Sequence, residues 1–347
     1  MASNDAWLAL VSEETLEPEL PICDPHHHLW DASHAPGLKF RAEQVESRYL
    51  LDELLADLAS GHNVVSTVFI ECAAMYRATG PKELRPLGET EFVNGIAAMS
   101  ASGQYGPTRV AAGIVGFADL TLGEAVRPVL EAHIAAGGGR FRGIRHGGGW
   151  DASDQVRNSH TNPPEGLFLQ PGFRAGFAQL APLGLSFEGW CYHPQLADLT
   201  DLARAFPETA IILDHFGGPL GIGPYAGKRE EILPQWRRDV AELARCPNVA
   251  AKLGGINMRI NGFDWQRRER PPTSEELAQA TRVYYEHCLE HFGPERCLFE
   301  SNFPVDKVSC SYNVLWNTFK RIAAGCTAAE KALLFHDTAA RVYRLDA

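Results

Sequence analysis

Short apolar runs rich in β-branched residues alternate with helical segments along the chain, and this alternation restricts the fold more than any other feature. Eight such runs stand at residues 21–28, 64–72, 110–117, 141–146, 185–193, 210–215, 249–253 and 297–302. Between them, segments such as 50–58, 124–136, 235–244 and 274–292 space their apolar residues as helices do. Strands that alternate with helices form βαβ units, so the 347 residues predict one α/β domain, a (β/α)8 TIM barrel.

The irregular segments are unevenly placed, because the long ones follow strands and the short ones precede them. Stretches rich in Gly, Pro and aromatic residues occupy 73–90, 147–172, 216–234, 254–273 and 303–311, whereas 206–209 and 246–248 are brief. In a barrel the long loops gather at the carboxyl ends of the strands, where active sites are built. A doubly wound open sheet is the competing fold, but no glycine-rich phosphate turn follows the first run. We predict one barrel domain over residues 21–347.

Charge and hydropathy restrict the partners. The chain has 32 Lys and Arg against 43 Asp and Glu, a net charge of −11, and no basic run, which argues against nucleic acids and anionic membranes. No apolar stretch approaches the ~20 residues of a membrane helix. We expect a small-molecule substrate, and a homo-oligomer is compatible with the sequence.

The first 20 residues are acidic and lack the basic start of a signal peptide, so we interpret residues 1–20 as an N-terminal arm. Eight scattered cysteines without a CxxC pair predict buried free thiols. A cytoplasmic protein fits both features.

The strongest local signal is the stretch DPHHH at residues 24–28, where the first strand ends. Side chains two apart on a strand point the same way, so His26 and His28 share a face and His27 turns to the other. Two imidazoles at a barrel mouth can bind one divalent cation. The alternative is a polar turn at a strand end.

Further polar side chains follow other strands, and in a barrel they converge on the same end. They are Glu71, Arg145, His146, His193, Asp214, His215, Glu300 and Asn302. A histidine satisfied within the core explains any one of these positions. It does not explain the whole set, which predicts an active site.

Three motifs together resemble the amidohydrolase superfamily, in particular its amidohydrolase-2 branch: DPHHH at 24–28, LDHFGGP at 213–219 and ESNFPVD at 300–306. The resemblance covers residues 22–345. That branch includes sugar lactonases, 2-pyrone-4,6-dicarboxylate lactonase and, more distantly, decarboxylases of aromatic acids. The resemblance implies a divalent metal, zinc or manganese, held by His26, His28, His193 and His215.

Asn302 departs from the family pattern, which has an aspartate at the end of strand eight to bind metal and take a proton from water. An amide can orient a ligand but cannot accept that proton. Glu71, Asp306, Glu300 and any histidine that does not bind metal are candidates for the missing base. We therefore expect a catalytic set of Asn302, His215, Glu71 and Asp306.

Substrate recognition is expected to centre on Arg145, because a guanidinium matches a carboxylate. Arg142, three residues earlier on the same strand, is expected to face the other way. The glycines that follow His146 permit close approach of a ligand, and the aromatic side chains of Trp150, Tyr76 and Trp190 can form flat walls. A structural ion pair is the alternative for Arg145.

These features predict a metal-dependent hydrolase, a lactonase that opens a carboxylated or sugar-derived cyclic ester. Three alternatives stay open. Asn302 favours a decarboxylase of an aromatic acid on the same barrel, since that reaction needs no activated water. The same histidines can also serve a metal-independent lactonase, and a catalytically inactive barrel that binds a ligand is the non-enzymatic possibility.

Overall fold

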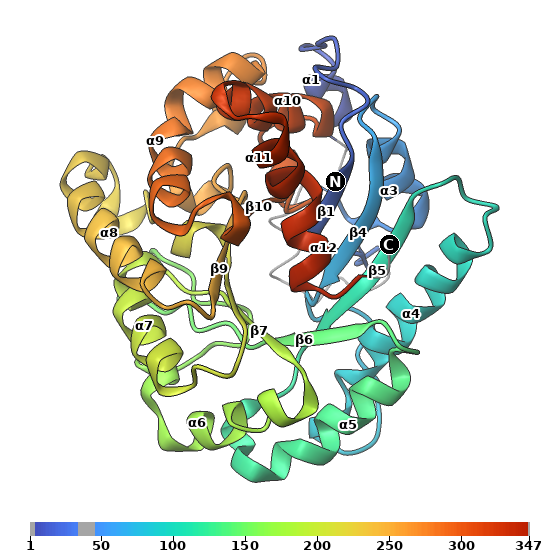
Figure 1. Cartoon of the computed structure of the whole chain (residues 1–347), viewed down its shortest axis with the longest axis vertical. Coiled ribbons are helices and arrows are strands. Elements are labelled where there is room, and N and C mark those ends of the chain that lie inside the picture. Colours follow the sequence, from blue (N-terminus) through green and yellow to red (C-terminus); the bar gives the residue numbers. More distant parts are fainter. Residues whose placement is uncertain (1–3, 34–45, 346–347) are drawn as a thin grey trace.

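The computed structural model describes residues 4–33 and 46–345 and forms the predicted barrel (Figure 1). Eight parallel strands follow one another in chain order around the ring. They are β1 (Ile22–His27), β4 (Val64–Ile70), β5 (Arg109–Gly116), β6 (Phe141–Arg145), β7 (Ser186–Gly189), β8 (Ile211–Leu213), β9 (Val249–Leu253) and β10 (Cys297–Phe299). Backbone hydrogen bonds from His28 N to Phe303 O (2.8 Å) and from Asn302 N to His26 O (2.9 Å) join the last strand end to the first.

The helices surround the strands as an outer layer (Figure 1). They are α1 (Asp5–Leu8), α3 (Leu51–Leu58), α4 (Leu87–Ala101), α5 (Arg127–Ala136), α6 (Pro171–Phe177), α7 (Leu196–Ala205), α8 (Arg229–Ala244), α9 (Ser274–Phe292), α10 (Tyr312–Ile322), α11 (Ala328–Ala332) and α12 (Thr338–Val342). The predicted helix at 274–292 is confirmed at both ends, since α9 has the same bounds. Thr273 and Glu276 form a capping box at its start. A small antiparallel pair, β2 (Trp30–Asp31) and β3 (Arg48–Tyr49), follows β1.

The described part of the N-terminal arm lies on the outer helices. Lys320 of α10 donates to the backbone oxygens of Leu16 (2.6 Å) and Glu17 (2.9 Å). Glu13 accepts from the Ser274 hydroxyl at the start of α9 at 2.6 Å. Backbone oxygens of the arm and the carboxylate of Glu13 thus accept hydrogen bonds that fasten the arm to the barrel.

The C-terminal helix closes the amino end of the barrel. Ala339 and Tyr343 pack with inward-facing residues of the strands, among them Cys23 and Leu298. Figure 1, which looks down the barrel, shows α12 lying across the ring of strands. The opposite end, where the strands terminate, carries the long loops.

Two further expectations are met within the described residues. All eight cysteines are free, and seven of them are buried. No described helix combines the length and apolar character needed to cross a bilayer.

Candidate active site

His26 and His28 point to the same side of β1, as the sequence predicts, and their Nε2 atoms lie 3.3 Å apart. His27 faces the other way, with Nε2 2.9 Å from the Thr67 hydroxyl. The Nδ1 atom of His28 lies 2.8 Å from the carbonyl oxygen of Ile70, which can only accept, so Nδ1 carries the proton. The Nε2 lone pair of His28 is therefore directed at His26.

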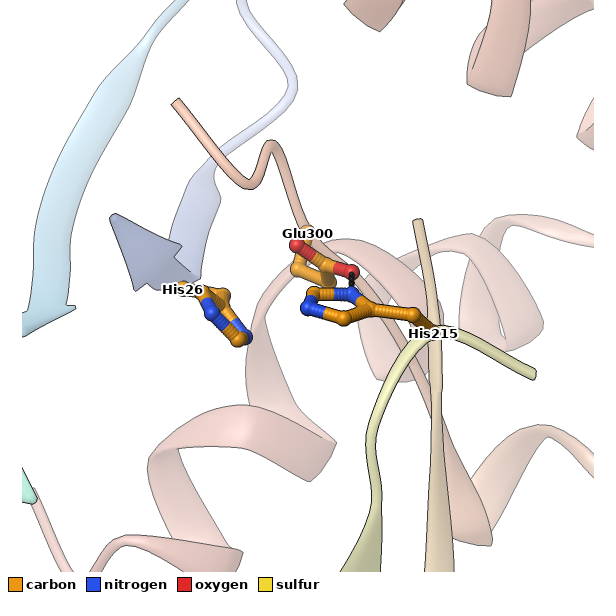
Figure 2. A group of neighbouring side chains, drawn as sticks. All are labelled: His26, His215 and Glu300. Atoms are coloured by element: carbon orange, nitrogen blue, oxygen red, sulfur yellow. Dashed lines mark hydrogen bonds and ion pairs between the residues drawn. The ribbon is translucent and has the colours of Figure 1, made fainter. Parts of the chain in front are cut away.

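His215 follows β8 and is oriented by Glu300, which follows β10. Figure 2 shows the hydrogen bond between His215 Nδ1 and Glu300 Oε1, which is 2.7 Å long, with His26 facing the same ring. The ring centroids of His26 and His215 are 4.4 Å apart. The carboxylate holds the proton on Nδ1 and leaves Nε2 of His215 with a free lone pair. We call His26, His28 and His215 the imidazole cluster.

The backbone around the cluster is held in an uncommon conformation. His215 (φ 51°) and Asn302 (φ 53°) both lie in the left-handed region, which histidine and asparagine tolerate better than most residues. Gly255 (φ 69°) follows β9, and a Cβ built there lies 2.2 Å from His215 Nδ1. The absent side chain of Gly255 therefore makes room for the hydrogen bond between His215 and Glu300.

A continuous network of buried charges lies beside the cluster. Arg145 Nε contacts Glu71 Oε1 (2.8 Å) and Arg145 Nη1 contacts Asp214 Oδ2 (3.3 Å). Lys252 Nζ lies 3.3 Å from Asp214 Oδ1 and 2.7 Å from Glu188 Oε2. Because negative and positive charges alternate from Glu71 to Glu188, each charge has an opposite neighbour. We call these five residues the ion-pair network.

The network also contacts the cluster at His26. His26 Nδ1 lies 3.3 Å from Lys252 Nζ, and His26 Nε2 lies 3.3 Å from Arg145 Nη1. Burial lowers the pKa of His26 well below its usual value, and the cations of Lys252 and Arg145 lower it further. The pKa of His28 is lowered in the same way by burial and by Arg145. Both imidazoles are therefore neutral, which is the form that binds metal or accepts a proton.

Sequence reasoning did not find Lys252 or Glu188. Each is a lone charged residue inside an apolar strand, VAAKL for Lys252 and SFEG for Glu188. That pattern was a usable signal, since a buried charge requires a partner of opposite sign.

Glu71 and Asp306, two of the bases that the sequence suggests, are not among the residues that line the cavity over the imidazole cluster. Burial raises the pKa of Glu71, but the His160 and Arg145 side chains beside it outweigh this and lower it. Burial raises the pKa of Asp306 well above its usual value, and Glu300 adds to this effect.

A cavity of about 440 Å³ opens over the imidazole cluster. His28, His215, Asn302, Arg145 and Trp190 are among the residues that line it. Trp190 packs edge-on against His215, with ring centroids 5.0 Å apart. Two of the five expected substrate-binding residues, Arg145 and Trp190, thus line the cavity and contact histidines of the cluster.

The other expected binding residues lie elsewhere. Tyr76 and His146 line a neighbouring cavity of about 510 Å³, and His160 borders both cavities. Trp150 lines neither cavity.

The structure does not bring His193 into the cluster. Its Nδ1 accepts a hydrogen bond from Leu220 N (3.3 Å), and its ring packs edge-on against Tyr225 at 5.1 Å.

Three atoms that can bind a metal converge at the cluster. His28 Nε2 lies 3.3 Å from both His26 Nε2 and Asn302 Oδ1. Ligands at 2.0–2.1 Å from a tetrahedral zinc ion lie about 3.3 Å apart, so these spacings fit such an ion. His26, His215 and Glu300 form a second possible set of ligands. Each offers one nitrogen or oxygen atom, and these three atoms lie within 4.8 Å of one another. The donor set, of imidazole nitrogens and one amide oxygen, suits a divalent cation of the zinc type.

Comparison with known proteins gives concordant results. The model of the amidohydrolase family matches residues 23–345. An uncharacterized protein, y4mH, of Sinorhizobium fredii is 34% identical over 94% of this chain and 99% of its own length. L-fucono-1,5-lactonase of Burkholderia multivorans is 26% identical over 93% of this chain and 95% of its own length. An amidohydrolase of Burkholderia multivorans with bound zinc has the same fold, with a TM-score of 0.69, 24% identity and coverage of 94% and 99%.

Proposed function

We infer that this chain, which belongs to the amidohydrolase family, is a hydrolase that opens a lactone ring. The observation that carries the proposal is that His28 and His215, which each keep a lone pair on Nε2, line one cavity beside His26. The similarity to an L-fucono-1,5-lactonase over nearly the full length supports the lactone as the class of substrate.

His26, His28 and Asn302 would hold a divalent metal ion, with zinc favoured over manganese by the imidazole ligands. When bound, such an ion supplies positive charge to the lactone carbonyl and lowers the pKa of water. Asn302 contributes its amide oxygen and takes no proton. His193 is left out of this set because its Nδ1 accepts a hydrogen bond from Leu220 N, which uses the lone pair of the ring and leaves the proton on Nε2.

His215 is the residue suited to accept the proton from the attacking water, in place of the usual aspartate. Its Nε2 is free, and the hydrogen bond from Nδ1 to Glu300 stabilises the imidazolium that forms. As the water oxygen bonds to the carbonyl carbon, its proton passes to Nε2. When the ring C–O bond breaks, Nε2 returns that proton to the departing ring oxygen, which yields a hydroxy acid.

The test compares His28→Asn with His193→Asn, a matched change at a buried histidine outside the cluster. We expect purified wild-type protein and His193→Asn to contain one equivalent of metal and to open lactones, as measured by acid release at constant pH. His28→Asn should lose the metal and the activity. Equal metal content in both variants would refute the assigned ligands, and a wild-type protein that opens no lactone would refute the function.

Decarboxylation of an aromatic acid is the second candidate, and Asn302 favours it. That reaction replaces a carboxylate by a proton on carbon and needs no base to activate water. Incubation of the wild-type protein with hydroxylated aromatic acids and with lactones separates the two functions. Release of CO₂ supports decarboxylation, and formation of a hydroxy acid supports the lactonase.

A further inference from the structure

Three side chains near the end of α9 lie close together on the outside of the barrel. His287, Glu290 and His291 are spaced i, i+3 and i+4, which places them on one face of the helix. Each offers one nitrogen or oxygen atom, and these three atoms lie within 4.8 Å of one another. The two imidazole ring centroids are 4.4 Å apart. Two imidazoles and a carboxylate are a donor set that suits a divalent transition metal.

The ring of His287 is held in one orientation by α8. Its Nε2 lies 2.8 Å from the backbone oxygen of Arg237, which can only accept, so Nε2 carries the proton and Nδ1 keeps the lone pair. The buried ring of Trp236 packs against His287, with ring centroids 5.4 Å apart. Figure 1 shows α8 and α9 side by side in the outer layer. Histidines that bind metal usually donate their other N–H to such a group, so His287 already has the required tautomer.

The charge of Glu290 is placed where a cation would stabilise it. Glu290 lies in the last turn of α9, where the helix dipole presents its negative end. Glu286, four residues earlier, is a second carboxylate on the same face, and its own partner is Arg282 at 3.5 Å. Among the described residues, no lysine or arginine forms an ion pair with Glu290. A divalent ion held by Glu290 would offset both repulsions.

The three atoms need to approach one another further to bind one ion. Ligand atoms on a tetrahedral zinc ion lie about 3.3 Å apart, so the widest spacing has to close by about 1.5 Å from 4.8 Å. Glu290 and His291 are exposed, and rotation of their side chains between staggered conformations supplies this movement while His287 stays fixed. The solvent side of the group leaves the fourth position to water.

We propose that His287, Glu290 and His291 form a second site for a divalent ion of the zinc type, which stabilises the end of α9. Residues 293–296 connect this end of α9 to the start of β10, so the site lies at the amino end of the barrel, opposite the imidazole cluster. The proposal therefore does not rest on the proposed function. Because the ion would join two turns of α9, and His287 is bonded to α8, binding should oppose unfolding of this part of the outer layer.

The first experiment measures metal content after dialysis against a buffered micromolar concentration of free Zn²⁺. His291→Gln removes one imidazole at an exposed position and should contain one equivalent of zinc less than the wild type. His28→Asn, which alters the imidazole cluster, should also contain one equivalent less, and the double variant two. Equal zinc contents of wild type and His291→Gln would overturn the proposal.

The same measurement distinguishes a failure of this proposal from a failure of the proposed function. If the imidazole cluster holds no metal, the wild type should contain one equivalent of zinc and His291→Gln none. The difference between wild type and His291→Gln thus reports on the α9 site alone.

Two variants serve as matched controls. His336 is a partly exposed histidine outside the group that pairs with Asp337 at 2.8 Å, and Glu286 is an exposed carboxylate one turn before Glu290. His336→Gln and Glu286→Gln should keep the zinc content of the wild type. Calorimetric titration of Glu290→Gln should show zinc binding weakened by about tenfold or more at this site. A loss in the controls equal to that in His291→Gln would mean non-specific binding to the surface and would overturn the site.

Thermal unfolding provides a second measurement that does not depend on activity. An ion that binds only the folded chain raises the Tm by mass action. With His28→Asn as the background, excess Zn²⁺ should raise the Tm by a few degrees, and the additional change His291→Gln should abolish the shift. The same shift in both proteins would show that the stabilising ion binds elsewhere.

Discussion

The imidazole cluster and the ion-pair network are neighbours built from the ends of the same strands, yet they differ in how their polar atoms are paired. In the network, each charge from Glu71 to Glu188 has a partner of opposite sign within 3.3 Å. In the cluster, His28 and His215 each use Nδ1 to fix the ring and leave Nε2 free. The paired groups hold the barrel interior together, and the free lone pairs remain for chemistry. Each prediction below alters one side of this contrast.

The largest effect is expected from His215→Asn in the cluster. Without an imidazole to accept the proton of water, kcat should fall about 10³-fold, within the range for loss of a general base. The midpoint of thermal unfolding should also fall, because the buried carboxylate of Glu300 loses the hydrogen bond from His215 Nδ1. A variant that retains kcat would show that another group is the base.

Lys252→Met in the network should act on stability. The change leaves Glu188 and Asp214 without their shared cation and should lower the free energy of unfolding by about 3 kcal/mol, measured by urea titration. Burial raises the pKa of Glu188, which means that a negative charge left there without Lys252 is unfavourable. The double variant Lys252→Met with Glu188→Gln should therefore recover part of the loss, and no recovery would contradict this account.

Gly255→Ala links the two regions, because its new Cβ would displace the His215 ring from Glu300. We expect kcat to fall about 10²-fold, the order of loss that a small misplacement of a reacting group produces. Gly184→Ala is the control, since Gly184 has a similar φ of 67° and no atom within 4 Å of the built Cβ. Equal activities of the two variants would mean that the clash is relieved without moving His215.

The smallest effect is expected from Tyr343→Phe. The Tyr343 hydroxyl donates to Glu188 Oε1 at 2.6 Å from the closed end of the barrel. Its removal should lower the free energy of unfolding by about 1 kcal/mol and leave kcat and KM unchanged. A change in kcat larger than twofold would show that the network also adjusts the cluster.

The sequence predicted the fold well because the relevant signals are local. Seven of the eight predicted strands contain a barrel strand, the one at 110–117 overlaps β5 but begins one residue after it, and the helix at 274–292 is confirmed at both ends. Strand periodicity also placed His26 and His28 on one face and His27 on the other. These outcomes depend on residues close together in the chain.

Partners from distant strands could not be read from the sequence. Arg145 was expected to bind a substrate carboxylate, and the fold places Glu71 and Asp214 against it. His193 ends a predicted strand as His215 does, yet a hydrogen bond from Leu220 N occupies its Nδ1.

The sequence by itself determined the alternation of strands and helices, and therefore the barrel and the end of it at which polar residues gather. Only the tertiary structure decided the protonation pattern of that end. Whether a histidine presents a lone pair depends on the atom opposite its other nitrogen, which is Ile70 O for His28 and Glu300 Oε1 for His215. Those atoms come from other strands, so the chemistry of the site is fixed when the ring of strands closes.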